Sequence, residues 1–175
     1  MNLVLIGYRG TGKSTIGKLA ADLLEFEYVG LDDEIVRMSG MSIPEIVEKY
    51  SWDYFRDLES DVVAQYSLRN DQVLDTGGGV VIRPKNTEHL KKNGILVLLK
   101  ASLEDITQRI GTSDARPSLT GNKDFLEEIE EVLAARRPLY ETAADFVVDT
   151  SKMPPAEAAA TIATRFKQLA RERER

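Results

Sequence analysis

Continuous apolar runs alternate along the chain with segments in which apolar residues recur at helical spacing. The runs lie at residues 2–6, 28–31, 73–74, 95–99 and 146–148. Runs without polar alternation are typical of strands that are buried on both faces of a parallel sheet. The segments between them predict helices at about 13–24, 32–40, 42–50, 52–66, 102–110, 125–140 and 155–170. The pattern therefore predicts a five-stranded parallel sheet with helices on both faces, a three-layer α/β/α fold.

The 175 residues contain no linker, internal repeat or low-complexity block, so we expect a single domain over 1–175. Residues 111–124 are rich in Gly, Ser, Thr, Asp and Asn and are expected to form a mobile loop. In parallel sheets, ligands bind beyond the carboxyl ends of the strands. This rule directs attention to the loop after Ile6, to Asp32, to the glycines after Asp75 and to the segment after Lys100.

Composition narrows the possible functions. The chain has 23 Lys and Arg against 29 Asp and Glu, a net charge of −6, which argues against a nonspecific nucleic-acid or membrane binder. The absence of Cys removes disulfides and thiolate sites, and the single His, His89, argues against a His-based zinc site or a Ser-His-Asp triad. The chain has no membrane-length or signal-like apolar stretch, so we expect a protein of the cytoplasm without a membrane partner. We also expect a monomer that has no nucleic-acid partner.

Residues 7–14, Gly-Tyr-Arg-Gly-Thr-Gly-Lys-Ser, match the P-loop pattern between a predicted strand and a predicted helix. Glycines allow backbone N–H groups to converge on an anion, and the following helix adds its positive end. Lys13 can reach the β- and γ-phosphates, and the Ser14 hydroxyl can coordinate Mg²⁺. The loop predicts a P-loop NTPase-type fold and nucleoside triphosphate binding at Gly10, Thr11, Gly12, Lys13, Ser14 and Thr15.

The motifs beyond the P-loop resemble those of shikimate kinases. They are Asp32-x-x-Ile35, Phe55-Arg56-x-x-Glu59, Thr76-Gly77-Gly78-Gly79, Arg116-Pro117 and Arg136-x-Pro138-Leu139-Tyr140, in the order and spacing of the family from residue 2 to about 150. The resemblance implies an ATP- and Mg²⁺-dependent kinase that phosphorylates the 3-hydroxyl of shikimate, in the route to chorismate and the aromatic amino acids. It also implies a fold like that of nucleoside monophosphate kinases, with mobile parts: a substrate-binding segment at about 32–62 and a lid at 111–124.

By this resemblance, shikimate contacts Asp32, Arg56, Gly78, Gly79 and Arg136. A guanidinium binds a carboxylate bidentately, which suits Arg56 and Arg136 to the substrate carboxylate. Arg137 is the alternative to Arg136, and the alternative for Arg56 is a solvated charge on its helix. The glycine run has an alternative role as a sharp turn between strand and helix.

Asp32 is the expected catalytic carboxylate, because it can orient the acceptor hydroxyl and accept its proton. Phosphoryl transfer needs little base strength, so orientation is the larger contribution. Asp33 is the rival, and N-capping of the next helix is the alternative role for both residues.

On the nucleotide side, the resemblance implies that Arg116 reaches the phosphates from the lid and that Arg109 and Pro154 flank adenine. Closure of a lid excludes water and brings a positive charge to the transferring group. The alternative is an ordinary surface loop with a solvated arginine.

One position departs from the family pattern. The family has two acids spaced i, i+2 at the end of the second strand, and the first of them helps to hold the water shell of Mg²⁺, but this chain has Gly30 there. Because side chains alternate along a strand, Asp33 is not expected to replace that acid. We hypothesise that Asp75, at the end of the third strand, holds the metal-bound water instead. Its alternatives are capping of the glycine turn or exposure to solvent.

Two other functions are compatible with the motifs. One is a P-loop kinase that acts on a sugar acid or a nucleoside monophosphate. The other is a nucleotide-gated binding module without turnover. The reason to consider it is Gly30, which stands where the family has an acid.

Overall fold

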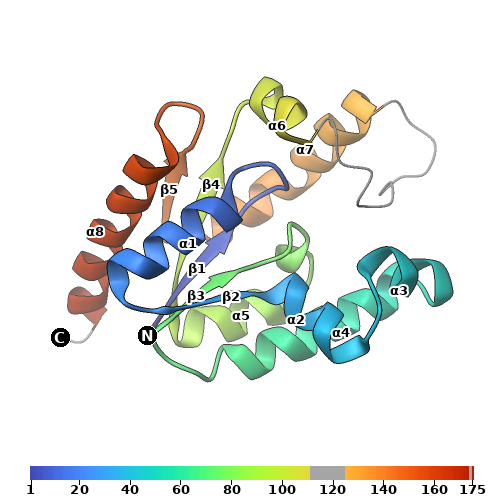
Figure 1. Cartoon of the computed structure of the whole chain (residues 1–175), viewed down its shortest axis with the longest axis horizontal. Helices are drawn as coiled ribbons and strands as arrows, with labels where there is room; N and C mark the ends of the chain where they lie inside the picture. Colours follow the sequence, from blue (N-terminus) through green and yellow to red (C-terminus); the bar gives the residue numbers. More distant parts are fainter. Residues whose placement is uncertain (111–124, 174) are drawn as a thin grey trace.

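In the computed structural model, which describes residues 1–110, 125–173 and 175, one parallel sheet forms the centre of the molecule (Figure 1). Its strands are β1 (Asn2–Ile6), β2 (Glu27–Gly30), β3 (Gln72–Asp75), β4 (Gly94–Lys100) and β5 (Phe146–Asp149). They lie in the order β2-β3-β1-β4-β5, and every neighbouring pair is parallel. The predicted five-stranded parallel sheet is confirmed.

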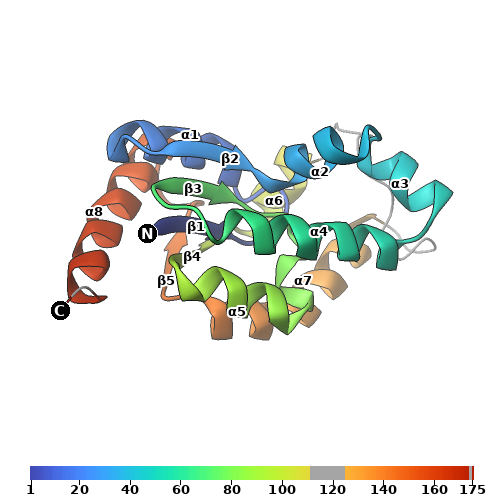
Figure 2. The same ribbon diagram turned by 90° about the horizontal axis from the view of Figure 1, so that it is seen from below.

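Helices cover both faces of the sheet (Figure 2). Helices α1 (Lys13–Leu24) and α8 (Pro155–Arg173) pack together on one face, and α4 (Trp52–Tyr66), α5 (Pro84–Lys92) and α7 (Phe125–Ala143) cover the other. The remaining helices are α2 (Leu31–Ser39), α3 (Ile43–Lys49), the 3₁₀ turn η1 (Val80–Ile82) and α6 (Leu103–Ile110). No helix within the described ranges is both long enough and apolar enough to cross a membrane.

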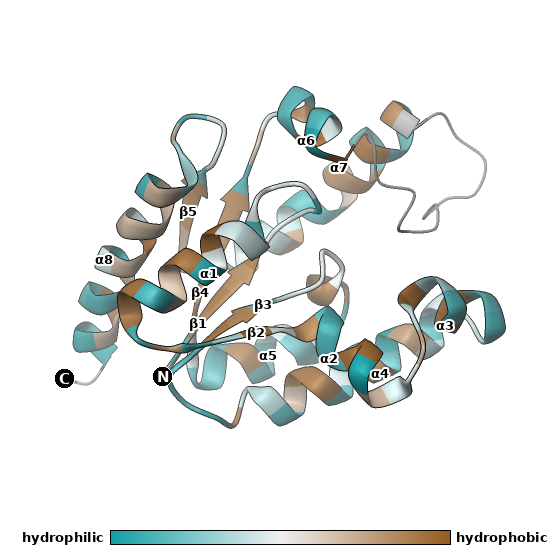
Figure 3. Cartoon of the chain, viewed as in Figure 1, coloured by the Kyte–Doolittle hydropathy of each residue, from teal (hydrophilic) through white to brown (hydrophobic). Residues whose placement is uncertain are grey.

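The alternation of side chains along β1 explains why its sequence is wholly apolar. Leu3 and Leu5 enter the core on the α1 and α8 side, while Val4 and Ile6 enter the core on the α4 and α7 side. All four side chains are fully buried. Figure 3 shows the same pattern as hydrophobic colour along the strands, beneath helices whose outer faces are hydrophilic.

The boundary between β2 and α2 differs from the prediction. The apolar pattern predicts that Leu31 belongs to the strand, but β2 ends at Gly30 and Leu31 begins α2. Leu31 and Ile35 are four residues apart, so a helix that begins at Leu31 places both of them in the core that Val29 enters from the strand. Asp32 and Asp33 therefore lie in the first turn of a helix that Gly30 caps, so the predicted N-capping role of these two aspartates is wrong.

Candidate functional site

The P-loop lies at the carboxyl end of β1, and its shape depends on glycine. Gly7, Gly10 and Gly12 have φ of 142°, 80° and 91°, in the region that side chains disfavour. A Cβ on Gly7 would also lie 2.5 Å from the Leu99 carbonyl oxygen. Lys13 is buried, and its Nζ donates to the carbonyls of Gly7 and Tyr8 at 2.9 and 3.1 Å. Lys13 thus holds the loop closed as well as pointing its charge into it.

Two hydroxyl groups converge on Asp75 beside the P-loop. Ser14 Oγ donates to Asp75 Oδ2 at 2.6 Å, and Tyr28 Oη donates to the same oxygen at 2.8 Å. Asp75 is only 8% exposed, so the predicted alternative of a solvent-facing carboxylate is wrong. Together with Lys13 and Asp33, Ser14 and Asp75 line the cavity above the P-loop.

The oxygen groups of this cavity fit a magnesium ion. Mg²⁺ prefers hard oxygen ligands and usually takes one or two carboxylates, with phosphates and water completing its shell. Within the described residues, no group of three or more His, Cys, Asp or Glu side chains is placed to hold a metal by itself. The donor set of Ser14, Asp75 and Asp33 therefore suits an ion that arrives with a nucleotide.

The carboxylate of Asp33 lies over Gly30, which strand alternation alone does not predict; whether Asp33 replaces the missing acid is a separate, functional question. A Cβ on Gly30 would be 2.6 Å from Asp33 Oδ2. Strand alternation does not apply here because residues 31–33 are helical, and the third residue of a helix folds back over its N-cap position. Asp33 therefore occupies the space that a side chain at position 30 would need.

A second cavity lies next to the first, between α4, α7 and the glycine run. Its charged lining residues include Asp32, Arg56, Glu59 and Arg136. Arg56 is 9% exposed, and its Nη1 donates to Glu59 Oε2 at 2.8 Å, so the alternative of a solvated helix charge is wrong. Burial raises the pKa of Glu59, and the guanidinium of Arg56 opposes this shift.

Charged side chains approach the glycine run closely. A Cβ on Gly77 would lie 2.7 Å from Asp32 Oδ1 and 2.9 Å from Glu59 Oε1. A Cβ on Gly79 would lie 2.1 Å from Arg56 Nη2. Gly79 has φ of −103°, which any residue can adopt, so the turn itself does not explain the glycine.

The structure separates the two adjacent arginines of α7. Arg136 Nη1 donates to the Gly78 carbonyl at 3.0 Å, and the hydroxyl of Tyr140, one turn later, donates to the same oxygen. Burial raises the pKa of Tyr140 to about 12. Arg137 instead donates to Glu141 at 3.0 Å and has a side chain that is 70% exposed. Of the pair, Arg136 is the one that lines the second cavity.

The two cavities share a wall formed by Arg9, Asp32, Gly77 and Gly78. Asp32 therefore lies where a group bound at the P-loop would meet a molecule in the second cavity. Arg9 is a residue that the sequence interpretation missed. Its side chain is mostly buried, 3.7 Å from Glu128. The sequence offered one signal for Arg9, which is a basic residue at one of the variable positions of the P-loop pattern.

Arg109 contacts the P-loop at Gly10 but lines neither of the two cavities. Its Nη1 donates to the Gly10 carbonyl at 3.2 Å and to Thr150 Oγ1 at 3.3 Å. Pro154 directly precedes α8, and its carbonyl accepts the first N–H bond of that helix, from Ala158. Arg116 and the predicted lid at 111–124 lie outside the described residues.

Comparison with known proteins places the chain among shikimate kinases by sequence. The family model for shikimate kinase matches residues 9–167. A shikimate kinase of Thermodesulfovibrio yellowstonii is 41% identical over 96% of both chains, and one of Caldanaerobacter subterraneus is 40% identical over 96% of this chain and 97% of the relative. The structure of shikimate kinase from Acinetobacter baumannii in complex with shikimate has a TM-score of 0.90 at 34% identity, covering 95% of this chain and 93% of that one. A gluconokinase from Sinorhizobium meliloti, at 19% identity and a TM-score of 0.55, resembles this chain in fold alone.

The raised pKa of Glu59 predicts a pH-dependent stability. The folded protein holds the Glu59 proton at pH values where the unfolded chain has released it, so this group lowers the free energy of unfolding as pH rises from its ordinary pKa of 4.5 toward the raised value. Urea unfolding at a series of pH values should therefore show the wild type losing stability relative to Glu59→Gln across this window.

Glu45→Gln is the matched control. Hydrogen bonds from Ser42 lower the pKa of Glu45, so the wild type should gain stability relative to this variant as pH rises. A wild-type minus Glu59→Gln difference that is flat or rises with pH would contradict the raised pKa.

Proposed function

The chain belongs to the shikimate kinase family, and we propose that it transfers the γ-phosphoryl group of ATP to the 3-hydroxyl of shikimate. The products are shikimate 3-phosphate and ADP, in the route to chorismate and the aromatic amino acids. The observation that carries this function is the pair of adjoining cavities, one at the P-loop and one that Arg9, Arg56 and Arg136 line, with Asp32 at their junction. We expect the enzyme to act as a monomer of the cytoplasm.

The P-loop cavity is proposed to bind ATP with Mg²⁺. Residues Gly10 to Thr15 surround the phosphates, Lys13 supplies a positive charge to them, and the Ser14 hydroxyl coordinates the ion. When bound, the ion neutralises charge that develops on the transferring phosphoryl group. Arg109, which contacts the Gly10 carbonyl, and Pro154 are proposed to flank adenine. Arg116 is proposed to reach the phosphates from the lid.

The second cavity is proposed to bind shikimate by its carboxylate and hydroxyls. Arg56 and Arg136 supply the guanidiniums, and each is already oriented, Arg56 by Glu59 and Arg136 by the Gly78 carbonyl. Donors that are fixed before binding lose little entropy when the substrate arrives. The absence of side chains at Gly78 and Gly79 leaves room for the ring between these groups.

Asp32 is proposed to orient the 3-hydroxyl and to accept its proton. It lies at the wall that both cavities share, so its carboxylate can contact the acceptor while the acceptor faces the P-loop. Positioning the two reactants in this way supplies much of the rate enhancement in phosphoryl transfer, because the transition state is loose.

Asp75 is proposed to hold a water bound to Mg²⁺ in place of the acid that is absent at position 30. Its hydrogen bond to Ser14 supports this role, since it links the carboxylate to the hydroxyl that coordinates the ion. Position 30 is the register partner of Asp75 on the neighbouring strand. A carboxylate there would face Asp75 and crowd Asp33, so Gly30 and Asp75 are mutually consistent.

The direct test is release of ADP from ATP and Mg²⁺ with shikimate, gluconate or AMP offered in parallel. We expect ADP release that depends on shikimate and is near background with the other two acceptors. Release with gluconate or AMP alone would move the protein to another class of P-loop kinase. ATP binding without ADP release from any acceptor would indicate a binding module without turnover.

Arg136→Ala should weaken shikimate binding far more than ATP binding. Loss of one partner of a buried, hydrogen-bonded charge pair costs about 2–5 kcal/mol. Arg137→Ala is the matched control, because Arg137 lies on the exposed side of α7 and pairs with Glu141. Calorimetric titration of both variants with each ligand separates the outcomes. Equal weakening of both ligands, or an inert Arg136→Ala beside a defective Arg137→Ala, would refute the assignment.

Asp75→Asn should raise the Mg²⁺ concentration needed for half-maximal rate by about 10- to 100-fold, the usual cost of removing a group that orients metal-bound water. Shikimate binding measured without nucleotide should change little, because Asp75 lines the P-loop cavity and not the second one. Steady-state rates over a Mg²⁺ series check this, and an unaltered Mg²⁺ dependence would remove Asp75 from the metal site.

A further inference from the structure

The hydrogen bonds to Asp75 are distributed unevenly over its two oxygens. Ser14 and Tyr28 both donate to Oδ2, at 2.6 and 2.8 Å. Among the residues that the structure describes, none is found donating to Oδ1, although the carboxylate lines the P-loop cavity. The arrangement fixes one oxygen and leaves the other for a hydrogen bond from outside the protein.

From this geometry we infer that the Tyr28 hydroxyl is a positioning group, which holds Asp75 so that its second oxygen can accept a hydrogen bond from metal-bound water. The inference rests on the proposed function of the P-loop cavity. Tyr28 does not touch the nucleotide or the substrate in this scheme. It acts through Asp75, and through Asp75 on Ser14.

The sheet register explains how Tyr28 reaches Asp75. Asp75 of β3 pairs with Gly30 of β2, and Tyr28 lies two residues before Gly30, on the same face of the strand. The Tyr28 side chain therefore lies on the side of the sheet that Asp75 faces, and its hydroxyl reaches the Asp75 carboxylate at 2.8 Å.

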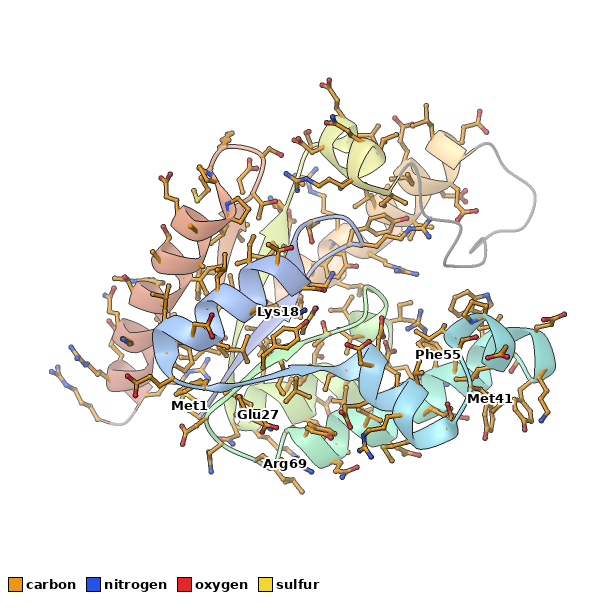
Figure 4. All side chains as sticks on the ribbon, viewed as in Figure 1. Met1, Lys18, Glu27, Met41, Phe55 and Arg69 are labelled. Carbon is orange, nitrogen blue, oxygen red and sulfur yellow. The ribbon has the colours of Figure 1, made fainter. Side chains whose placement is uncertain are left out.

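Packing holds the Tyr28 ring independently of its hydroxyl. A Cβ on Gly17 would be 3.0 Å from Tyr28 Cε2, so α1 passes close against the ring. On the same helix, Lys18 (labelled in Figure 4) has its Nζ 5.5 Å from the ring centroid. These contacts are made by the ring, so phenylalanine at this position keeps them and loses only the hydroxyl.

The charge on Asp75 also requires donors of this kind. A carboxylate that is 8% exposed loses hydration, and the O–H donors of Ser14 and Tyr28 replace hydrogen bonds that water would otherwise supply. Burial, and then the negative charge of Asp75, raise the pKa of Tyr28 well above its ordinary value.

Tyr28→Phe tests the inference with two readouts. We expect the Mg²⁺ concentration for half-maximal rate to rise roughly tenfold, toward the lower end of what removal of an outer ligand-orienting group costs. We also expect calorimetry to show weaker ADP binding with Mg²⁺ and unchanged ADP binding without it. The KM for shikimate should stay the same. Unchanged Mg²⁺ dependence in both readouts would overturn the inference.

Tyr66→Phe is the matched control. Tyr66 is buried, and its hydroxyl donates to Glu34 Oε2 at 2.5 Å, so the variant also loses a phenol–carboxylate bond, outside both cavities. Its Mg²⁺ dependence should match the wild type. If Tyr66→Phe raised the Mg²⁺ concentration for half-maximal rate as much as Tyr28→Phe does, the effect of Tyr28→Phe would reflect a general loss of stability, and the inference would fail.

A double-mutant cycle tests whether Tyr28 acts through Asp75. If it does, Tyr28→Phe should add little to the Mg²⁺ defect of Asp75→Asn, and the two effects should be strongly non-additive. Additive effects would overturn the inference. A wild type that releases no ADP with shikimate would refute the proposed function, while the ADP calorimetry with and without Mg²⁺ would still decide the role of Tyr28.

Discussion

The parallel pairing of β3 with both β1 and β2 is the constraint on which the site depends. In this register Asp75 is opposite Leu5 of β1 and opposite Gly30 of β2. The carboxyl ends of three strands therefore meet at one edge, where β1 continues into the P-loop, β2 into Asp32 and Asp33, and β3 into the glycine run. Because β1 and β3 are buried along their whole length, close packing holds their register and with it the position of the site.

Buried charge is the second organising feature. Arg56 and Glu59 form an ion pair in which both residues are nearly inaccessible, and such pairs often stabilise a fold little because desolvation offsets their attraction. The chain also keeps glycine at 77 and 79 to make room for these charges. The arrangement is better explained by function: a guanidinium fixed next to an open cavity is a preformed anion-binding group.

Several residues show where sequence reasoning succeeded and where it could not. The strand positions and the P-loop followed from local patterns, because apolar runs and the G-x-x-x-x-G-K-S spacing report local conformation directly. The family motifs pointed to Arg56, the glycine run and Arg136, which the structure brings together around one cavity. Arg9 was missed, since its placement at the wall of both cavities depends on how α4, α7 and the glycine run surround the P-loop.

By itself the sequence determined the parallel sheet, the phosphate-binding loop and the family, because each is encoded in residue type and spacing along a few turns or strands. Only the tertiary structure decided between Arg136 and Arg137, which differ by about 100° around a helix whose orientation the sequence does not show. The same holds for Asp33, which covers Gly30 because the chain turns into a helix one residue earlier than its pattern predicted. Contacts among Tyr28, Asp75 and Ser14 join three separate elements, and only the packed sheet brings their side chains within hydrogen-bonding distance.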